Sequence, residues 1–224
     1  MIVAVRKPFD EIYELVKRHK KVLVLGCGSC VTVCMAGGEK EAGVLASQIA
    51  LAAREKGDDI AVESHTITRQ CDREFFDEAT TRKMKEADAV ISIACGVGVQ
   101  FSIECLPKTI VYAGLNTTFY GATKEQGVWV ERCAGCGECV LNSFGGICPI
   151  ARCSKSLLNG PCGGSAKGKC EVDPENMDCA WQLIYDRMKE LGRLDELERN
   201  QPVKNWSHNR DGGPRKAVRE DMRL

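Results

Sequence analysis

The sequence predicts an α/β fold, in which a doubly wound parallel sheet is followed by a small, irregular, Cys-rich metal-binding domain and a C-terminal helix. Three observations support this fold class. Short apolar runs alternate with amphipathic segments in the first half, glycine and cysteine then dominate without apolar periodicity, and helical periodicity returns near residue 178. We expect an α/β cluster-binding domain over residues 1–128, a Cys-rich metal-binding domain with the C-terminal helix over 129–200, and an extended tail over 201–224.

The first domain alternates predicted helices and strands. Helical periodicity favours helices over residues 9–19, 39–56 and 97–105. A further helix is expected after Asp72, which would cap it, and this helix would carry Phe75, Phe76, Ala79 and Met84. Buried strands are expected over residues 22–25, 60–63, 89–93 and 109–112. Gly57 stands where a left-handed cap would end the second helix. Right-handed crossovers between such strands would make the sheet parallel.

The second half lacks the apolar residues of an ordinary core. From about Val130 the chain is rich in Gly, Cys, Asn, Ser and Pro, so bound metal would have to supply its folding free energy. A helix is expected from Asp178 to Gly192. From Lys204 to Arg223 there are six Lys or Arg against three Asp or Glu, which favours a solvated tail.

The composition is that of a soluble globular protein. Hydrophobic residues make up 44% of the chain, and no apolar run approaches the ~18 residues that a membrane span needs. The first residues show no apolar signal region, so a cytoplasmic location is expected. The 31 Lys and Arg balance the 31 Asp and Glu, whereas proteins that bind nucleic acid usually carry a basic excess. A nucleic-acid partner is therefore not expected.

Fourteen cysteines in a chain without an export signal favour metal or redox chemistry over disulfides. Three of them, Cys27, Cys30 and Cys34, directly follow the first strand, and Cys71 and Cys95 follow the next two. Loops at the carboxyl ends of parallel strands converge, so either Cys71 or Cys95 could complete a set of four thiolates. An iron–sulfur cluster is favoured there, and zinc is the alternative.

Gly26 and Gly28 flank Cys27 and are candidate cofactor-binding residues. They reproduce half of a dinucleotide fingerprint, but Val31 stands where the third glycine belongs, so nicotinamide binding is a weak interpretation.

The remaining metal-ligand candidates lie within 47 residues of one another in the second half. Cys133, Cys136 and Cys139 form a CxxCxxC run, and Cys148 precedes a proline as in ferredoxin-type sites. A further set of four could hold either zinc or a cluster, and consists of Cys153, Cys162, Cys170 and Cys179. Cys105 belongs to no motif. His65 and His208 have no partner at a catalytic spacing, and no triad or phosphate-binding loop is visible, so electron handling is the expected role.

Several motifs together resemble the MetV-type small subunit of methylenetetrahydrofolate reductase, and the resemblance covers nearly the whole chain. They are Gly26-Cys27-Gly28-Ser29-Cys30 with Cys34, Ala36-Gly37-Gly38-Glu39-Lys40-Glu41, Arg69-Gln70-Cys71, Gly145-Gly146-Ile147-Cys148-Pro149 with Ala151-Arg152-Cys153, and Leu158-Asn159-Gly160-Pro161-Cys162-Gly163-Gly164. The family is also described as a reductase C-terminal or zinc-finger-like domain.

This resemblance implies an iron–sulfur subunit that carries two or more [4Fe-4S] clusters, with zinc as the alternative at one of the four-cysteine sites. It implies a flavin-containing catalytic subunit as partner. Electrons would pass to or from the FMN of that subunit, in the methyl branch of the Wood–Ljungdahl pathway. The resemblance also allows further electron-donor subunits. Two alternatives stay open at this point. One is a zinc-stapled scaffold that only organises the reductase complex, and the other is a self-sufficient enzyme.

Overall fold

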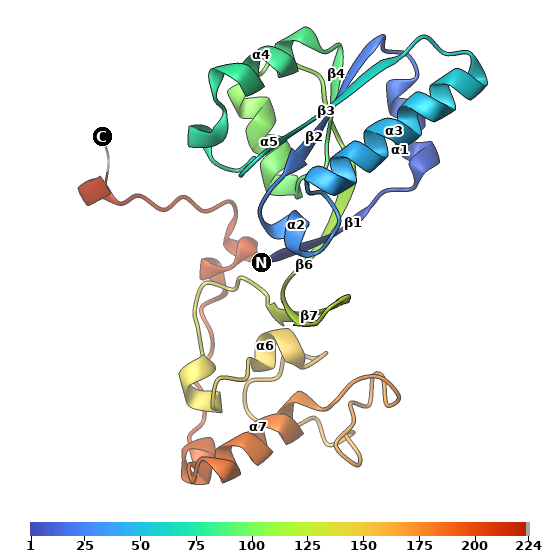
Figure 1. Ribbon diagram of the computed structural model, residues 1–224. Coiled ribbons are helices and arrows are strands. Elements are labelled where there is room, and N and C mark those ends of the chain that lie inside the picture. Colours follow the sequence, from blue (N-terminus) through green and yellow to red (C-terminus); the bar gives the residue numbers. More distant parts are fainter. Residues whose placement is uncertain (223–224) are drawn as a thin grey trace. The chain divides into compact units, whose positions relative to one another are not determined.

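The computed structural model describes residues 1–222. They form two compact units, Met1–Val130 and a second unit that begins at Glu131. A four-stranded parallel sheet forms the centre of the first unit (Figure 1). Its strands are β2 (Lys21–Cys27), β3 (Ala61–Ile67), β4 (Ala89–Ser92) and β5 (Val111–Ala113). They lie in the order β3-β2-β4-β5, and the register of each neighbouring pair is parallel. The predicted parallel sheet is therefore confirmed.

Helices cover both faces of this sheet, as expected for a doubly wound fold (Figure 1). The helices α1 (Phe9–Val16) and α3 (Glu39–Lys56) lie on one side, and α4 (Glu78–Glu86) and α5 (Gly96–Cys105) lie on the other. Alternate side chains of β2 enter different cores, because successive residues of a strand point to opposite faces. Val22 and Val24 pack in the α1 and α3 core, and Leu23 and Leu25 pack with Met84 of α4.

The predicted helix that begins at Asp72 is wrong. Asp72 caps only a short 3-10 turn, Arg73–Phe75, and α4 begins after Asp77. The Asp77 carboxylate accepts a hydrogen bond from the Thr80 backbone N–H at 2.7 Å, which satisfies an amide that the first helical turn leaves unpaired. Two capping aspartates five residues apart thus divide the segment into two elements.

A second, antiparallel sheet was not predicted from the sequence. It contains β1 (Ile2–Arg6), β6 (Leu115–Glu125) and β7 (Val128–Cys133), in the order β1-β6-β7. Most side chains of β6 are exposed, so the strand lacks the apolar alternation that would indicate it. The buried side chains of this sheet, Val3, Ala4 and Leu115, join the core that α1 and α3 cover.

The second unit contains little regular structure. Its helices are α6 (Pro149–Arg152) and α7 (Ala180–Glu190), and its short 3-10 helices are Leu141–Phe144, Leu194–Glu198, Trp206–His208, Arg210–Gly212 and Glu220–Met222. The predicted helix near residue 180 is confirmed, and Gly192 follows it with φ +68°. A small core forms around α7, where Trp181, Ile184 and Met188 pack with Phe144 and Cys179.

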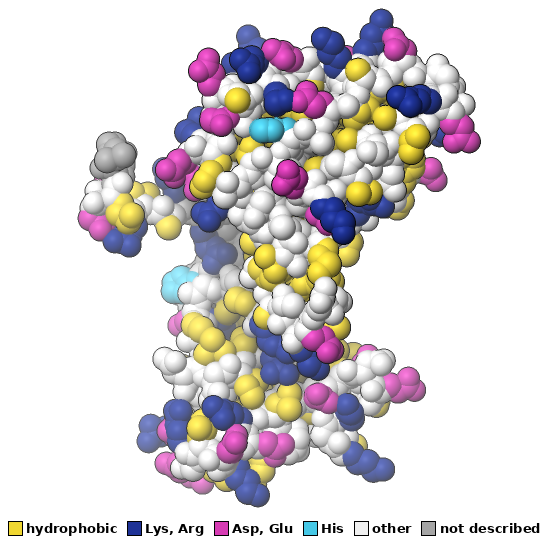
Figure 2. Space-filling model, viewed as in Figure 1, with side chains coloured by type: hydrophobic (Ala, Val, Ile, Leu, Met, Phe, Trp, Pro, Cys, Tyr) yellow, Lys and Arg dark blue, Asp and Glu magenta, His cyan; other side chains and the backbone are white. Residues whose placement is uncertain are grey.

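Acidic and basic side chains are interspersed over the visible surface (Figure 2), in keeping with the balanced charge of the sequence. Within residues 1–222, no helix has the length and the apolar character that crossing a membrane requires.

Candidate metal sites

The first cysteine group lies at the carboxyl edge of the parallel sheet. Cys27 is the last residue of β2, Cys71 follows β3, and Cys95 caps α5 just after β4. The crossover from β2 leads to β3 on one side, and the chain then returns to β4 on the other side. This change of direction creates the switch point at which open α/β sheets bind ligands.

The structure brings Cys27, Cys71 and Cys95 close enough for their charges to interact. Partial removal of the Cys71 sulfur from water raises the pKa of its thiol, and Cys95 and then Cys27 raise it further, because neighbouring thiolates would repel one another. Cys27 and Cys95 are buried, whereas Cys71 is exposed. A cation placed among them would relieve this repulsion.

The other two cysteines of this group lie on the loop that follows β2. Cys30 begins the short helix α2 (Cys30–Val33) and is half-buried, and Cys34 ends it. The Cys34 thiol is buried and donates to the carbonyls of Val31 at 3.7 Å and Ala4 at 3.8 Å. Cys34 shares one buried core cluster with Cys27 and Cys95, whereas Cys30 does not belong to that cluster.

Close backbone packing fixes this loop against the end of the sheet. The Cys27 N–H donates to Gly37 O at 2.9 Å, and a Cβ on Gly37 would lie 1.8 Å from the Ile93 carbonyl oxygen. Only glycine fits at position 37. Of the two glycines beside Cys27, Gly28 uses its N–H to bond Ile67 O at 2.8 Å, and Gly26 packs against Thr66.

A buried glutamine holds the same sheet edge together, and sequence reasoning gave it no role. The Gln70 side chain is fully buried and donates to Leu25 O at 2.9 Å and Gly26 O at 3.0 Å. Its carbonyl oxygen accepts from Ser92 Oγ at 2.7 Å and from Ser102 Oγ at 3.3 Å. Gln70 thereby links β2, β4 and α5 and fixes the backbone next to Cys71. In the sequence, only the position of Gln70 next to the candidate ligand Cys71 points to its importance.

In the second unit, four cysteines line one small cavity. The cavity has a volume of about 20 Å³, which is the scale of one water molecule. Its cysteines are the members of the predicted set of four, Cys153, Cys162, Cys170 and Cys179. Residues separated by up to 26 positions thus line the same cavity, together with Lys155.

Backbone amides and a hydroxyl approach two of these four sulfurs. The Gly164 N–H is the main group that lowers the pKa of the Cys162 thiol, with a smaller effect of Lys155. The pKa of Cys170 is also lowered, first by the Ser154 hydroxyl, which lies 3.5 Å from the sulfur, and then by the Val172 N–H. Such hydrogen bonds stabilise thiolates, which are the form that binds metal.

The CxxCxxC loop makes similar contacts on its own. The Gly135 N–H donates to Cys133 Sγ at 3.3 Å, and the Cys136 thiol donates to Glu138 O at 3.6 Å. Cys139 is exposed, and Cys148 is half-buried at the start of α6. No described contact joins Cys148 to this loop.

These arrangements suit thiophilic metals by the chemistry of their donors, which are thiols supported by N–H groups. Among residues 1–222, however, no three Cys, His, Asp or Glu side chains lie close enough together to hold a metal ion. Cys105 ends α5 and packs against the core cluster that contains Met84. His65 bonds Thr80 Oγ1 at 3.0 Å, which is a structural role.

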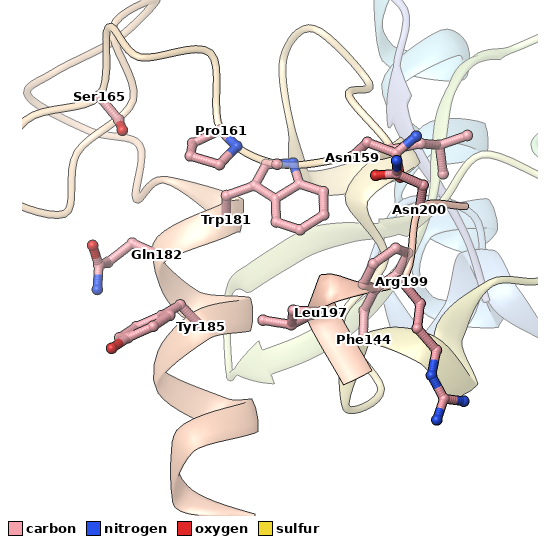
Figure 3. Close-up of a pocket in the computed structure, with 12 residues that line it drawn as sticks. Phe144, Asn159, Pro161, Ser165, Trp181, Gln182, Tyr185, Leu197, Arg199 and Asn200 are labelled. Carbon is pink, nitrogen blue, oxygen red and sulfur yellow. The ribbon is translucent and has the colours of Figure 1, made fainter. Parts of the chain in front are cut away.

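A larger cavity of about 470 Å³ adjoins the four-cysteine cavity, and both are lined by Pro161, Ser165 and Trp181. Figure 3 shows Trp181 and Tyr185 of α7 on one side of it and Arg199 on the other. The Trp181 indole is fixed in place, because it donates to Leu157 O at 3.0 Å and packs edge-on against Phe144. Trp181 is therefore a rigid wall shared by both cavities.

Comparison with known proteins gives one match. A family model described as "Methylene-tetrahydrofolate reductase C terminal" matches residues 112–207. No curated protein and no solved structure matches the chain.

Proposed function

We propose that this chain is an iron–sulfur electron-transfer subunit of a methylenetetrahydrofolate reductase complex. It would relay electrons to or from the FMN of a flavin-containing catalytic subunit in one-carbon metabolism. The observation that carries this proposal is the position of the family match. Residues 112–207 contain all eight cysteines of the second half of the chain, so the reductase-related segment is also the segment richest in candidate metal ligands.

The geometry of the first unit supports the same role. Cys27, Cys71 and Cys95 gather at the switch point of the sheet, where a bound group would be held by loops from three strands. Bound iron–sulfur clusters would supply one-electron transfer. The chain itself would hold them through its thiolates, direct N–H groups at the sulfurs, and exclude water at Cys27 and Cys95, which are buried.

A zinc-stapled scaffold is the second candidate function, and one observation favours it. The cavity among Cys153, Cys162, Cys170 and Cys179 has a volume of about 20 Å³, which suits a single ion better than a cluster of several atoms. If every cysteine set held zinc, the chain could organise the complex but could not carry electrons, because Zn²⁺ has no redox chemistry in proteins.

Anaerobic purification followed by iron, zinc and acid-labile sulfide analysis tests the proposal. We expect a brown protein whose broad absorption near ~400 nm bleaches with dithionite. Cys27→Ser should lower the iron and sulfide content, whereas the matched variant Cys105→Ser should leave both unchanged. A colourless protein that contains zinc and no sulfide would overturn the electron-transfer role and support the scaffold.

A further inference from the structure

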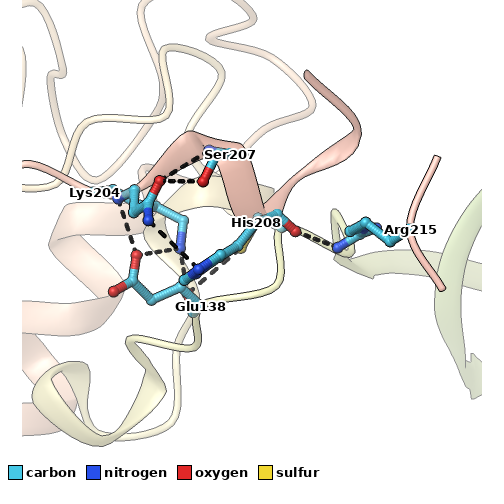
Figure 4. A network of polar contacts seen from close by, with 7 residues as sticks. Glu138, Lys204, Ser207, His208 and Arg215 are labelled. Carbon is cyan, nitrogen blue, oxygen red and sulfur yellow. Dashed lines mark hydrogen bonds and ion pairs between the residues drawn. The ribbon is translucent and has the colours of Figure 1, made fainter. Parts of the chain in front are cut away.

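Residues 204–215 of the C-terminal segment contact the CxxCxxC loop of the second unit (Figure 4). The charge count of this segment favours a solvated tail, but the Lys204 side chain is only 1% exposed. Its ammonium donates to the Glu138 carbonyl oxygen and lies 3.6 Å from Glu138 Oε2. The same carboxylate oxygen accepts from the Asn205 N–H at 3.0 Å. Glu138, which lies between Cys136 and Cys139, is thus bound through both its backbone and its side chain.

A second contact secures the other side of the loop. Arg215 donates to the Gly135 carbonyl oxygen at 3.2 Å and also to His208 O. Gly137 lies against the same turn, and a Cβ there would be 2.2 Å from His208 O. Its φ of +81° is also one that favours glycine. The glycine at position 137 therefore allows the loop to pack closely against residues 204–215.

The buried ammonium lies beside a candidate metal ligand. The Cys136 thiol donates to the same Glu138 carbonyl oxygen that accepts from Lys204, at 3.6 Å. A single oxygen atom therefore separates the sulfur from the positive charge. Burying a lysine costs several kcal/mol unless negative groups compensate it, and the Glu138 carboxylate is itself half-exposed. Metal-bound thiolates of this loop would provide further negative charge.

We infer that Lys204 is a positioning residue of the Cys133–Cys139 metal site, which holds the loop through Glu138 and supplies positive charge beside Cys136. This inference rests on the proposed function, because it requires that the loop binds metal. A positive charge next to a cluster stabilises its reduced, more negative form and so raises its reduction potential. It also favours metal retention, because it stabilises the thiolate ligands.

The test compares Lys204→Met with Lys216→Met, which removes an equal charge from an exposed position of the same segment. Both proteins are purified anaerobically in full length, and the rate of iron release to a chelator is measured. We expect Lys204→Met to lose iron on the order of 10-fold faster than the original protein. A redox titration should show a more negative midpoint potential for one cluster. Lys204→Arg, which keeps the charge, should restore that potential.

The outcomes separate the inference from the function on which it rests. If Lys204→Met and Lys216→Met release iron equally and share one midpoint potential, the inference is overturned while the proposed function stands. If Lys204→Arg fails to restore the potential, the lysine serves packing alone and the charge role is overturned. If the original protein binds iron elsewhere but none at residues 133–148, the inference is overturned while the proposed function stands. If it binds no iron at all, both are overturned.

Discussion

At the scale of single residues, Gln70 is a fully buried polar side chain of the first unit. Its amide serves two backbone carbonyls and two hydroxyls in a fully buried site. Gln70→Leu would remove all four hydrogen bonds at once. Ser102 Oγ and Leu25 O would keep their bonds to Gly98 O and Ile93 N–H, and each group left unsatisfied would cost ~1–3 kcal/mol. We therefore expect a loss of about 2–4 kcal/mol in the free energy of unfolding, measured by urea denaturation.

Gln100 on α5 supplies the matched control for this variant. Its side chain is exposed, so Gln100→Leu should change the free energy of unfolding by no more than about 0.5 kcal/mol. Equal stabilities of the two variants would contradict the role given to Gln70.

Tyr13 provides a pH-dependent test at the same scale. Burial, followed by a hydrogen bond of 2.6 Å to Asp58, raises its pKa to about 12. The unfolded chain would release this proton near pH 10, so the stabilising effect is complete below about pH 10 and is lost as the pH rises toward about 12. Tyr13→Phe should remove this part of the alkaline loss of stability, as followed by circular dichroism. A variant that unfolds along the original pH curve would be inconsistent with the assignment.

At the scale of elements, the parallel sheet could be predicted because its strands are buried on both faces. Runs such as Val22 to Leu25 are then continuously apolar and easy to detect. The antiparallel sheet could not be predicted in this way, since β6 is largely exposed and β1 is only five residues long. Asp72 and Asp77 show a second limit. Both suit a helix cap, and the structure starts α4 after the second of them, with Met84 packed against Leu23 and Leu25 of β2.

The four-cysteine cavity leads to a prediction about the segment from residue 153 to 179. This segment contributes few side chains to the small core around α7, so metal binding, worth on the order of 10 kcal/mol, would supply much of its stability. Cys162→Ser should make it sensitive to protease while the parallel sheet of the first unit stays resistant, as read by mass spectrometry of the fragments. Cys105→Ser should keep the original pattern. Uniform cleavage of both units in Cys162→Ser would argue against separate stabilisation.

At the scale of the whole molecule, the candidate sites differ in how far the sequence predicts them. Cys27, Cys71 and Cys95 lie at or just after the ends of three parallel strands, so their shared edge of the sheet follows from the alternation of strands and helices in the sequence. The contact between Lys204 and Glu138 joins residues that are 66 positions apart. No periodic pattern in the sequence indicates this contact, so only the folded structure shows it. Gln70 is intermediate, because its neighbour Cys71 marks the loop but nothing in the sequence indicates its burial.

This chain and its proposed partner would carry out different steps of the reaction. Reduction of a folate at the hydride level requires a two-electron cofactor such as a flavin, whereas clusters pass electrons singly. If the chain is the conduit to such a flavin, we expect no turnover of methylenetetrahydrofolate by the chain alone. Together with a flavin-containing catalytic subunit, it should support electron exchange between a viologen dye and the folate.

Cys27→Ser should abolish the cluster-dependent part of this transfer, and Cys105→Ser should preserve it. Folate turnover by the isolated chain would show that it is an enzyme in its own right, and undiminished transfer through Cys27→Ser would exclude the first unit from the electron path.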